Sequence, residues 1–413
     1  MEKPYRLPVG LILAVLAQLF VVPSALAYSW VTEFADSQGD VGYITGIALD
    51  ASAVHIIYSD SGKFAIRYAK KTSSGWTTEE VLKTGTASAL ALDAAGNPHI
   101  SYTFTSGTTT TLGYASKVGN APWTYSNIES SSQVLIRDSA IALGTNGSVH
   151  ISYRAGPRLK YATKSGGPWT TSVVDGGPPL NKTVGSYSSI ALDANGSPRI
   201  SYYNLTDKTL MYAEWLGTTW LKDTADFGGD TGWYTSLALD TRGFPHISYY
   251  DSLHNKVKYI TWDASGRGYW IQNAAGRGEV VDTVGVGART AILLNSQNIP
   301  AIAYQGGTLP NFELRYAART GTGQNKWVSE VVDTGGAGVG VSMKQIADGN
   351  PHISYSHLVP SSSPVSKLKH AYPALIPIYV VWILIPLLFA LLVMAGMRMK
   401  SRKKSRKKSR KKS

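Results

Sequence analysis

The sequence predicts an all-β fold built from one repeated unit, and three observations lead to this prediction. The 413-residue chain is rich in strand-forming and turn-forming residues, with 24 Tyr, 11 Trp and 41 Gly. A segment like Ser-Ile-Ala-Leu-Asp-Ala-Asn-Gly-Ser-Pro-Arg-Ile-Ser-Tyr-Tyr (189–203) recurs along the chain. The last copy is incomplete, and a segment matching its missing part lies near the N-terminus.

The repeat length is typical of the blades of a β-propeller. A tyrosine ends the second strand of each copy, at spacings of 44 to 55 residues: Tyr58, Tyr102, Tyr153, Tyr202, Tyr249, Tyr304 and Tyr355. Repeats of about 40 to 50 residues are typical of four-stranded propeller blades. We therefore predict a seven-bladed β-propeller over residues 28–371.

Each unit divides into strands a to d, counted outward from the propeller axis. Strand a is the Ile-Ala-Leu-Asp segment, and a turn such as 193–196 supplies the positive φ that a tight hairpin needs. Strand b is the His-Ile-Ser-Tyr segment, and strand c ends in a Tyr-Ala step. Strand d is expected to open with a tryptophan, at Trp76, Trp123, Trp169, Trp220, Trp270 and Trp327.

These six tryptophans leave the seventh unit without a strand d. Residues 30–36 (Trp-Val-Thr-Glu-Phe-Ala-Asp) match the pattern of residues 76–82. An unpaired sheet edge is a liability, so a propeller must join its last blade to its first. We predict that the segment at Trp30 completes the seventh blade beside the strand near His370. Tandem β-sandwiches, the alternative fold, would not need a split repeat.

The unit resembles the blade repeats of prokaryotic cell-surface β-propeller proteins. The resemblance rests on the motif Leu-Asp-x-x-Gly-x-Pro-His-Ile-Ser-Tyr at 92–102 and 239–249, and it covers nearly all of residues 28–371. It implies a fold and a location but no reaction. A weaker likeness to the Asp-box repeats of sialidase-like propellers lies in turns such as 73–76, which lack the Ser-x-Asp-x-Gly core.

Both ends of the chain carry membrane signals. Lys3 and Arg6 precede an apolar run, and Ala25-Leu26-Ala27 resembles a cleavage site, so residues 1–27 are predicted to be a signal peptide. Residues 372–397 are 26 residues without charge, which predicts a transmembrane helix. Residues 398–413 hold eleven Lys and Arg and no acid. Such a tail stays in the cytoplasm and can contact anionic lipid, which predicts a single-pass cell-membrane protein with its propeller outside.

The charge distribution argues against nucleic acid as a partner. The net charge is +13, but residues 28–397 hold 27 basic and 26 acidic residues once the two ends are removed. The folded part is therefore nearly neutral, unlike a nucleic-acid-binding domain. The absence of Cys excludes disulfides and thiolate chemistry. With no nucleophile elbow, phosphate loop, dinucleotide fingerprint or His-Glu-x-x-His motif, we predict no cofactor and no metal.

The loops between strands b and c are the most variable segments, and we expect them to share one rim with the d–a loops. Exposed loops on a rigid repeat scaffold commonly carry binding function. The predicted ligand-binding residues are Asp60, Arg154, Arg158, Asn204, Tyr250, Asp251, His254, Gln305 and His357. Further aromatic residues can stack on sugar rings or pack between blades: Tyr203, Tyr234 and Trp233.

Two other repeated residue types have structural explanations. Five histidines occupy the first position of strand b, and a group repeated around a ring cannot converge on one metal: His55, His99, His150, His246 and His352. Four aspartates end strand d: Asp36, Asp175, Asp282 and Asp333. They are expected either to form a ring of carboxylates for Ca²⁺ or, in preference, to stabilise turns through hydrogen bonds.

Three functional hypotheses follow. The first is a membrane-anchored recognition module that binds an extracellular protein or glycan through the loop rim and is not an enzyme. The second is a sialidase-like glycoside hydrolase or lyase acting at the central pocket. It requires two carboxylates, or an arginine cluster with a tyrosine and an acid; the arginines to inspect are Arg154, Arg158 and Arg289. The third is a structural cell-envelope protein.

Overall fold

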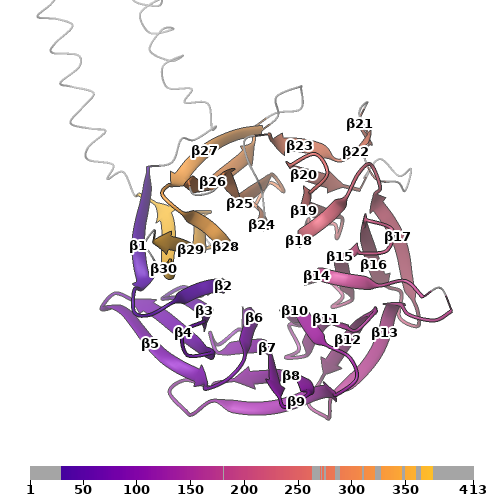
Figure 1. The fold of residues 1–413 in the computed structure, drawn as a ribbon, viewed down its shortest axis with the longest axis horizontal. Helices are drawn as coiled ribbons and strands as arrows, with labels where there is room; N and C mark the ends of the chain where they lie inside the picture. Colours follow the sequence, from indigo (N-terminus) through magenta and orange to yellow (C-terminus); the bar gives the residue numbers. More distant parts are fainter. Residues whose placement is uncertain are drawn as a thin grey trace, which may run out of the picture. The chain divides into compact units, whose positions relative to one another are not determined.

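The computed structural model describes residues 29–374, apart from 180, 263–269, 271, 274–275, 284–288, 309–310, 321–326, 347–348 and 360–363. Within these residues, seven four-stranded antiparallel sheets and one two-stranded ribbon surround a central axis (Figure 1). The predicted all-β, seven-bladed propeller is therefore confirmed.

The blades are numbered in chain order, and each is written from its inner strand to its outer one. Blades 1 to 3 are β2 (Val41–Leu49), β3 (Val54–Asp60), β4 (Ala65–Thr72), β5 (Gly75–Leu82); β6 (Thr86–Leu92), β7 (Pro98–Ser106), β8 (Thr109–Ser116), β9 (Thr124–Ser131); and β10 (Ile136–Leu143), β11 (Val149–Ala155), β12 (Arg158–Lys164), β13 (Thr170–Gly176). Blades 4 and 5 are β14 (Val184–Leu192), β15 (Pro198–Asn204), β16 (Thr209–Trp215), β17 (Trp220–Asp226); and β18 (Thr231–Leu239), β19 (Pro245–Asp251), β20 (Lys256–Thr261), β23 (Glu279–Asp282). Blades 6 and 7 are β24 (Thr290–Leu294), β25 (Pro300–Thr308), β26 (Asn311–Arg319), β27 (Trp327–Asp333); and β28 (Ala337–Gln345), β29 (Pro351–Val359), β30 (Val365–Pro373), β1 (Trp30–Asp36).

Burial follows the position of a strand within its blade. Strand b is covered by a neighbouring blade on each side, and every residue of β3 and β19 is buried. The polar residues of these strands, such as His55 and Asp60, are buried as well and have hydrogen-bond partners nearby. The outer strand faces solvent, as in β13, where the first four residues are exposed. The hydrophobic core therefore consists of layers of side chains packed between neighbouring blades.

The N-terminal strand closes the ring as predicted. β1 pairs with β30 as the outer strand of blade 7. On one side the indole Nε1 of Trp30 donates to Glu330 of blade 6 (2.8 Å). On the other side Asp36 accepts hydrogen bonds from Tyr58 (2.7 Å) and Arg67 (2.6 Å) of blade 1. One short strand therefore binds three blades together.

Six of the seven strand-b tyrosines join neighbouring blades through the same hydrogen bond. Their hydroxyls donate to a carboxylate at the end of the preceding blade's strand d, and a nearby Lys or Arg neutralises that carboxylate. The Tyr–carboxylate pairs are Tyr58–Asp36, Tyr153–Glu129, Tyr202–Asp175, Tyr249–Asp226, Tyr304–Asp282 and Tyr355–Asp333. The cations are Arg67, Lys160, Lys222, Lys258, Arg315 and Lys369. The four predicted aspartates thus serve blade contacts instead of a shared Ca²⁺ ring, although Asp36 and Asp333 also accept a turn N–H as expected.

The strand-b histidines have the structural role that their repetition suggested. In four blades the ring Nδ1 lies within hydrogen-bond distance of a strand-c tyrosine, in the pairs His55–Tyr68, His99–Tyr114, His150–Tyr161 and His246–Tyr259. Each tyrosine ring then packs edge-on against a tryptophan of the following blade: Trp123, Trp169, Trp220 and Trp327. In blade 7, His352 contacts His370 in place of a tyrosine.

Blade 5 departs from the predicted pattern. Its outer strand β23 begins at Glu279 and not at Trp270, because a short ribbon of β21 (Gln272–Asn273) and β22 (Gly276–Arg277) lies between them. Trp270 is nevertheless buried and packs against Tyr212 of blade 4. Trp270 therefore occupies the same kind of core position as the other tryptophans, although the segment between it and the outer strand is longer.

The predicted segments at the two ends lie almost entirely outside the described residues. These are the signal peptide at 1–27, the tail at 398–413 and all but the start of the span at 372–397. β30 continues to Pro373, so strand c of blade 7 extends two residues past the predicted boundary. Among the described residues there is no helix with the length and apolar character needed to cross a bilayer. The chain separates into two compact units, Met1–Tyr372, which contains the propeller, and Pro373–Ser413.

Candidate functional site

A repeated β-bulge in strand a builds the wall of the central channel. The pairing of strand a with strand b shifts register in blades 1 to 5 and in blade 7. In blades 4 and 5 a glycine with positive φ starts the bulge, Gly185 and Gly232. A Cβ at either glycine would lie 2.9 Å from the backbone of Leu159 or Leu210 in the preceding blade. Close packing of the blades therefore requires glycine here, and the bulge turns the next residues toward the axis.

The bulge places one equivalent residue of each blade at the channel. In each blade, one residue of strand a pairs with the third residue of the His-Ile-Ser-Tyr segment in strand b. The residue at the channel lies two positions before it. In blade order these residues are Ile44, Ala87, Asp138, Tyr187, Tyr234, Arg289 and Gly340. We call them the bulge residues. Four of them have positive φ, in the range 52° to 75°: Asp138, Tyr187, Tyr234 and Arg289.

Left-handed backbone at bulky residues is unfavourable, by roughly 1–3 kcal/mol each. The four strained bulge residues belong to four successive blades, 3 to 6, and all of them line one cavity. Strain gathered at a cavity is typical of functional sites, where the surrounding structure holds side chains in place for a ligand. This arrangement marks the cavity as the candidate site.

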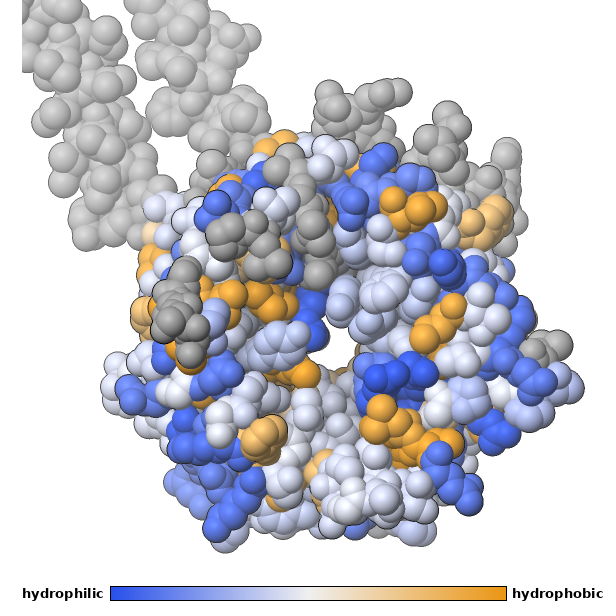
Figure 2. All heavy atoms as spheres, in the orientation of Figure 1, coloured by the Kyte–Doolittle hydropathy of each residue, from blue (hydrophilic) through white to orange (hydrophobic). Residues whose placement is uncertain are grey.

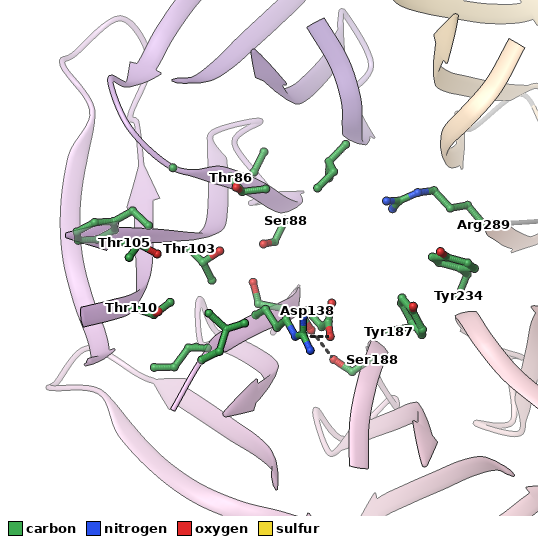
Figure 3. Close-up of a pocket in the computed structure, with 18 of the residues that line it drawn as sticks. Thr86, Ser88, Thr103, Thr105, Thr110, Asp138, Tyr187, Ser188, Tyr234 and Arg289 are labelled. Carbon is green, nitrogen blue, oxygen red and sulfur yellow. Dashed lines mark hydrogen bonds and ion pairs between the residues drawn. The ribbon is translucent and has the colours of Figure 1, made fainter. Parts of the chain in front are cut away.

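The cavity occupies the mouth of the central channel and has a volume of about 690 Å³. Strand a of each blade, or the residue just before it, contributes to the wall. Figure 2 shows the channel as a hollow at the centre of this face. Its volume lies within the ~300–1,000 Å³ that is usual for small-molecule sites. In Figure 3, Arg289, Tyr234 and Tyr187 lie along one side, opposite Thr86, Ser88 and Thr103. We call it the axial cavity.

Asp138 lies among three arginines. Arg137 approaches its carboxylate (Nε to Oδ2 3.9 Å), and Arg154 and Arg289 are close enough to act on its charge. Burial raises the pKa of Asp138 even though these arginines and the backbone N–H of Tyr187 favour its ionised form. Burial and the neighbouring Arg137 also lower the pKa of Arg154. One poorly solvated carboxylate thus lies in the field of three positive charges.

An aromatic cluster fixes the cationic side of the cavity. The rings of Tyr187 and Tyr234 lie 4.3 Å apart between centroids, and Trp233 lies 5.5 Å from Tyr187. The guanidinium of Arg289 lies over Tyr234 (5.4 Å) and over Tyr43 of blade 1 (5.9 Å). These ring faces hold the cation without neutralising it. Burial and Tyr234 raise the pKa of Tyr187, so its hydroxyl stays protonated at neutral pH.

A second cavity of about 440 Å³ adjoins the first over blades 3 to 5. The two cavities share Arg137, Asp138 and Tyr187. Its far wall contains Asp230, which accepts hydrogen bonds from Tyr203 (2.6 Å) and Trp233 (2.8 Å). Burial opposes ionisation of Asp230, but these hydrogen bonds outweigh it and lower its pKa. One site therefore brings together the three further aromatic residues named in the sequence analysis, Tyr203, Trp233 and Tyr234.

Of the predicted ligand-binding residues, Arg154 lines the second cavity. Its Nε donates to the Gly156 carbonyl and its Nη1 to the Ser186 hydroxyl, both at 2.8 Å. Arg158 is exposed at the start of β12 and packs beside Gly177, away from the axis. The structure therefore places Arg154 and Arg289 where each acts on the charge of Asp138, and leaves Arg158 apart.

Three other predicted residues are used within their own b–c turns. Asp60, Asn204 and Asp251 end strand b in blades 1, 4 and 5, and all are buried. Each accepts backbone N–H groups of the turn that follows, and Asp251 also contacts the exposed His254 (2.9 Å). Such hydrogen bonds form the turns themselves. Ligand binding by these side chains stays a prediction.

The last three predicted residues lie in separate blades. Tyr250 is buried and donates to Asn255 (2.7 Å), and Gln305 is buried within β25. His357 is half-buried, with Nδ1 3.6 Å from the Asp333 carboxylate of the preceding blade. The b–c turns and d–a turns do share one rim, as expected: the backbone N–H of Gly85 donates to the Phe64 carbonyl (2.8 Å).

Sequence reasoning missed Arg137, Asp138 and Tyr187. A signal was present, because a glycine two residues before the bulge recurs in Gly185-Ser186-Tyr187 and Gly232-Trp233-Tyr234. These segments precede the part of strand a that the repeat identifies, so the repeat pattern does not include them. Side chains that differ from blade to blade carry the chemistry of the channel.

The fold defines the class of this protein as a seven-bladed β-propeller. No protein-family model matches the sequence, and no curated protein matches it significantly. Solved structures with a similar fold include a protein of unknown function from Dyadobacter fermentans, with 11% identity over 70% of this chain and 95% of that one, and a TM-score of 0.52. YCF48 bound to a D1 peptide shares 11% identity over 85% of this chain and 98% of that one, also with a TM-score of 0.52. At these identities the likeness shows the fold alone.

Proposed function

We propose that this protein is a non-catalytic recognition module that binds a carboxylate-bearing ligand in the axial cavity. The observation that supports it is a cluster of positive charge, in which Arg137 approaches the Asp138 carboxylate and Arg154 and Arg289 act on its charge. Three arginines around one carboxylate leave the site with an excess of positive charge. Guanidinium groups bind carboxylates through paired hydrogen bonds, which suits a group presented at the channel mouth.

Binding is favoured over turnover by the acid–base groups of the cavity. Asp138 is the only carboxylate among the described residues that line the axial cavity, whereas glycoside hydrolysis generally uses two. Tyr187 has a raised pKa, which removes it further from the range where a general base works. An arginine cluster with a tyrosine and an acid does occur, so a lyase or sialidase-like activity is the second candidate. A purely structural envelope role gives no reason for a strained, charged cavity.

We extend the proposal to location. The charged and apolar segments at 1–27, 372–397 and 398–413 support an exported propeller anchored by one span with its tail in the cytoplasm. Protease added to intact cells should then remove the propeller and leave the tail intact. Complete protection of the propeller, with degradation only after lysis, would rule this topology out.

The binding test uses the full-length protein in mild detergent and isothermal titration with two acidic probes, tetragalacturonate and a glutamate-rich peptide. Arg289→Gln and Arg137→Gln should each weaken binding by about 10- to 100-fold, because both arginines line the cavity and each substitution removes a charge-assisted contact worth roughly 1.5–3 kcal/mol. Arg158→Gln is the matched control, since Arg158 is an exposed arginine away from the cavity. Its affinity should equal that of the wild type.

Two results would overturn this function. If the acidic probes bind no more tightly than their neutral counterparts, the carboxylate hypothesis is wrong. Sustained release of cleaved product, abolished by Asp138→Asn or Tyr187→Phe, would establish the enzymatic candidate instead. Unchanged thermal unfolding midpoints in the variants keep a folding defect from being mistaken for lost binding.

A further inference from the structure

The axial cavity has an outer arm that the carboxylate site does not use. It extends from the axis over blades 1 and 2 and reaches Phe64, Phe104 and Leu135. Phe64 is 76% exposed and Leu135 is 51% exposed. Exposed large apolar side chains at the end of a polar cavity indicate a surface that a ligand covers. We call these three residues the outer platform.

Phe64 is unusual for its backbone as well as for its exposure. It has φ +56° at the end of the b–c turn in blade 1. The same turn occurs in blades 4 and 5, four residues after the buried Asn204 and Asp251, where Lys208 (φ 58°) and Asn255 (φ 53°) hold this position. Asn adopts left-handed backbone readily, whereas a bulky ring does so at a cost. The turn therefore forms with a polar residue that has less backbone strain, such as Asn255. Blade 1 instead has an exposed aromatic ring at this position.

Hydroxyl groups line the cavity between the outer platform and the arginines. Thr86, Ser88 and Thr103 lie on the side of blade 2, opposite Tyr187, Tyr234 and Arg289 (Figure 3). Ser and Thr hydroxyls both donate and accept hydrogen bonds. The hydrogen bond from Gly85 N–H to the Phe64 carbonyl fixes the platform beside this hydroxyl wall. The cavity thus presents, in sequence, an aromatic surface, a row of hydroxyls and a cationic end.

This order matches the chemistry of an acidic oligosaccharide. A pyranose ring has an apolar face of C–H groups that packs on aromatic rings, and an edge of hydroxyls that exchange hydrogen bonds with Ser and Thr. A uronic-acid residue adds the carboxylate that the arginines would bind. Building on the function proposed above, we infer that the ligand is an acidic glycan of at least two sugar residues. Its uronate lies at Arg289, on the cationic side of the axial cavity, and a neighbouring sugar packs on Phe64.

The experiment separates the two subsites with probes of different length. Full-length protein is titrated with galacturonate, tetragalacturonate and a carboxyl-reduced tetrasaccharide. Phe64→Asn copies the residue that the same turn has at Asn255, so the turn should form and the unfolding midpoint should not fall. The variant should bind tetragalacturonate about five- to tenfold more weakly than wild type and bind galacturonate equally well. Arg289→Gln should weaken binding of both acidic probes.

The outcomes distinguish this inference from the function on which it rests. Equal affinity of Phe64→Asn and wild type for tetragalacturonate would overturn the outer subsite and leave the carboxylate site standing. Arginine-dependent binding of the acidic peptide, with no binding of either acidic saccharide, would overturn the glycan assignment alone. Binding of the carboxyl-reduced tetrasaccharide as tightly as tetragalacturonate would remove the carboxylate function as well.

Discussion

The two halves of the channel wall use one backbone position in opposite ways. In blades 3 to 6 the bulge residue is Asp138, Tyr187, Tyr234 or Arg289, each with left-handed backbone. In blades 7, 1 and 2 it is Gly340, Ile44 or Ala87, without positive φ. The repeat itself therefore does not impose the strain, since three blades form the same ring without it. Strain occurs where polar and aromatic side chains are directed at the channel, which ties it to the site.

The small half of the wall also serves the polar half. Arg289 of blade 6 reaches Tyr43 of blade 1, although blade 7 lies between these blades. Gly340, the bulge residue of blade 7, has no side chain to fill that space. It also allows the backbone of blade 1 to approach, because a Cβ there would lie 2.5 Å from the Tyr43 carbonyl oxygen. The asymmetry of the channel wall therefore depends on the small residue Gly340 as well as on the charged residue Arg289.

The largest effect that would break this comparison is expected at Gly340. Gly340→Ala places its methyl group against the backbone of Tyr43, which cannot move without displacing strand β2. Overpacking of this kind costs roughly 1–3 kcal/mol, measured as a fall in the free energy of unfolding in urea. Gly167→Ala is the matched control, because a Cβ at Gly167 meets nothing within 4 Å. Equal stability of the two variants would mean that blade 7 does not need its small bulge residue.

The sequence predicted features that repeat and missed features that occur once. The blade number, the closure by Trp30 and the structural role of the strand-b histidines all follow from residues found in several copies. Trp270 was placed at the start of a strand because it fits the repeat, although the chain inserts a ribbon after it. Periodicity identifies the core position of a residue but not the length of the chain that follows.

The site was harder to predict for a physical reason. Polar residues in variable loops were expected to face a ligand, yet Asp60 and Asn204 are buried because their side chains satisfy N–H groups of their own turns. Asp138 and Tyr187 lie in strands β10 and β14 but precede the part of strand a that the repeat identifies. The bulge that turns them toward the axis depends on the contact between blades, and no single repeat contains that information.

A smaller effect, of opposite sign, is expected at Asp138. The folded-state pKa of this carboxyl is raised, chiefly by burial, so its ionised form is disfavoured in the folded protein. Its contribution to stability is therefore lost as pH rises through the raised pKa, whereas the unfolded chain ionises near about pH 4. Asp138→Asn removes the charge, and Asn is compatible with φ 58°. The variant should match wild type at about pH 3 and become the more stable protein toward about pH 7, as measured by urea unfolding at each pH.

Asp138→Asn also tests how the charge of the cavity affects ligand affinity. With the carboxylate gone, the positive charges of Arg137, Arg154 and Arg289 act on the ligand without an internal competitor. Affinity for tetragalacturonate at neutral pH should rise by roughly two- to tenfold, up to about 1.4 kcal/mol. Ser188→Ala offers a control, because Ser188 lines the same cavity and donates to the backbone carbonyl of Asp138 without carrying charge. A tenfold loss of affinity in Asp138→Asn with stability intact would show that Asp138 accepts a hydrogen bond from the ligand. The arginines would then be positioned by Asp138 for binding, and the repulsion assumed here would be wrong.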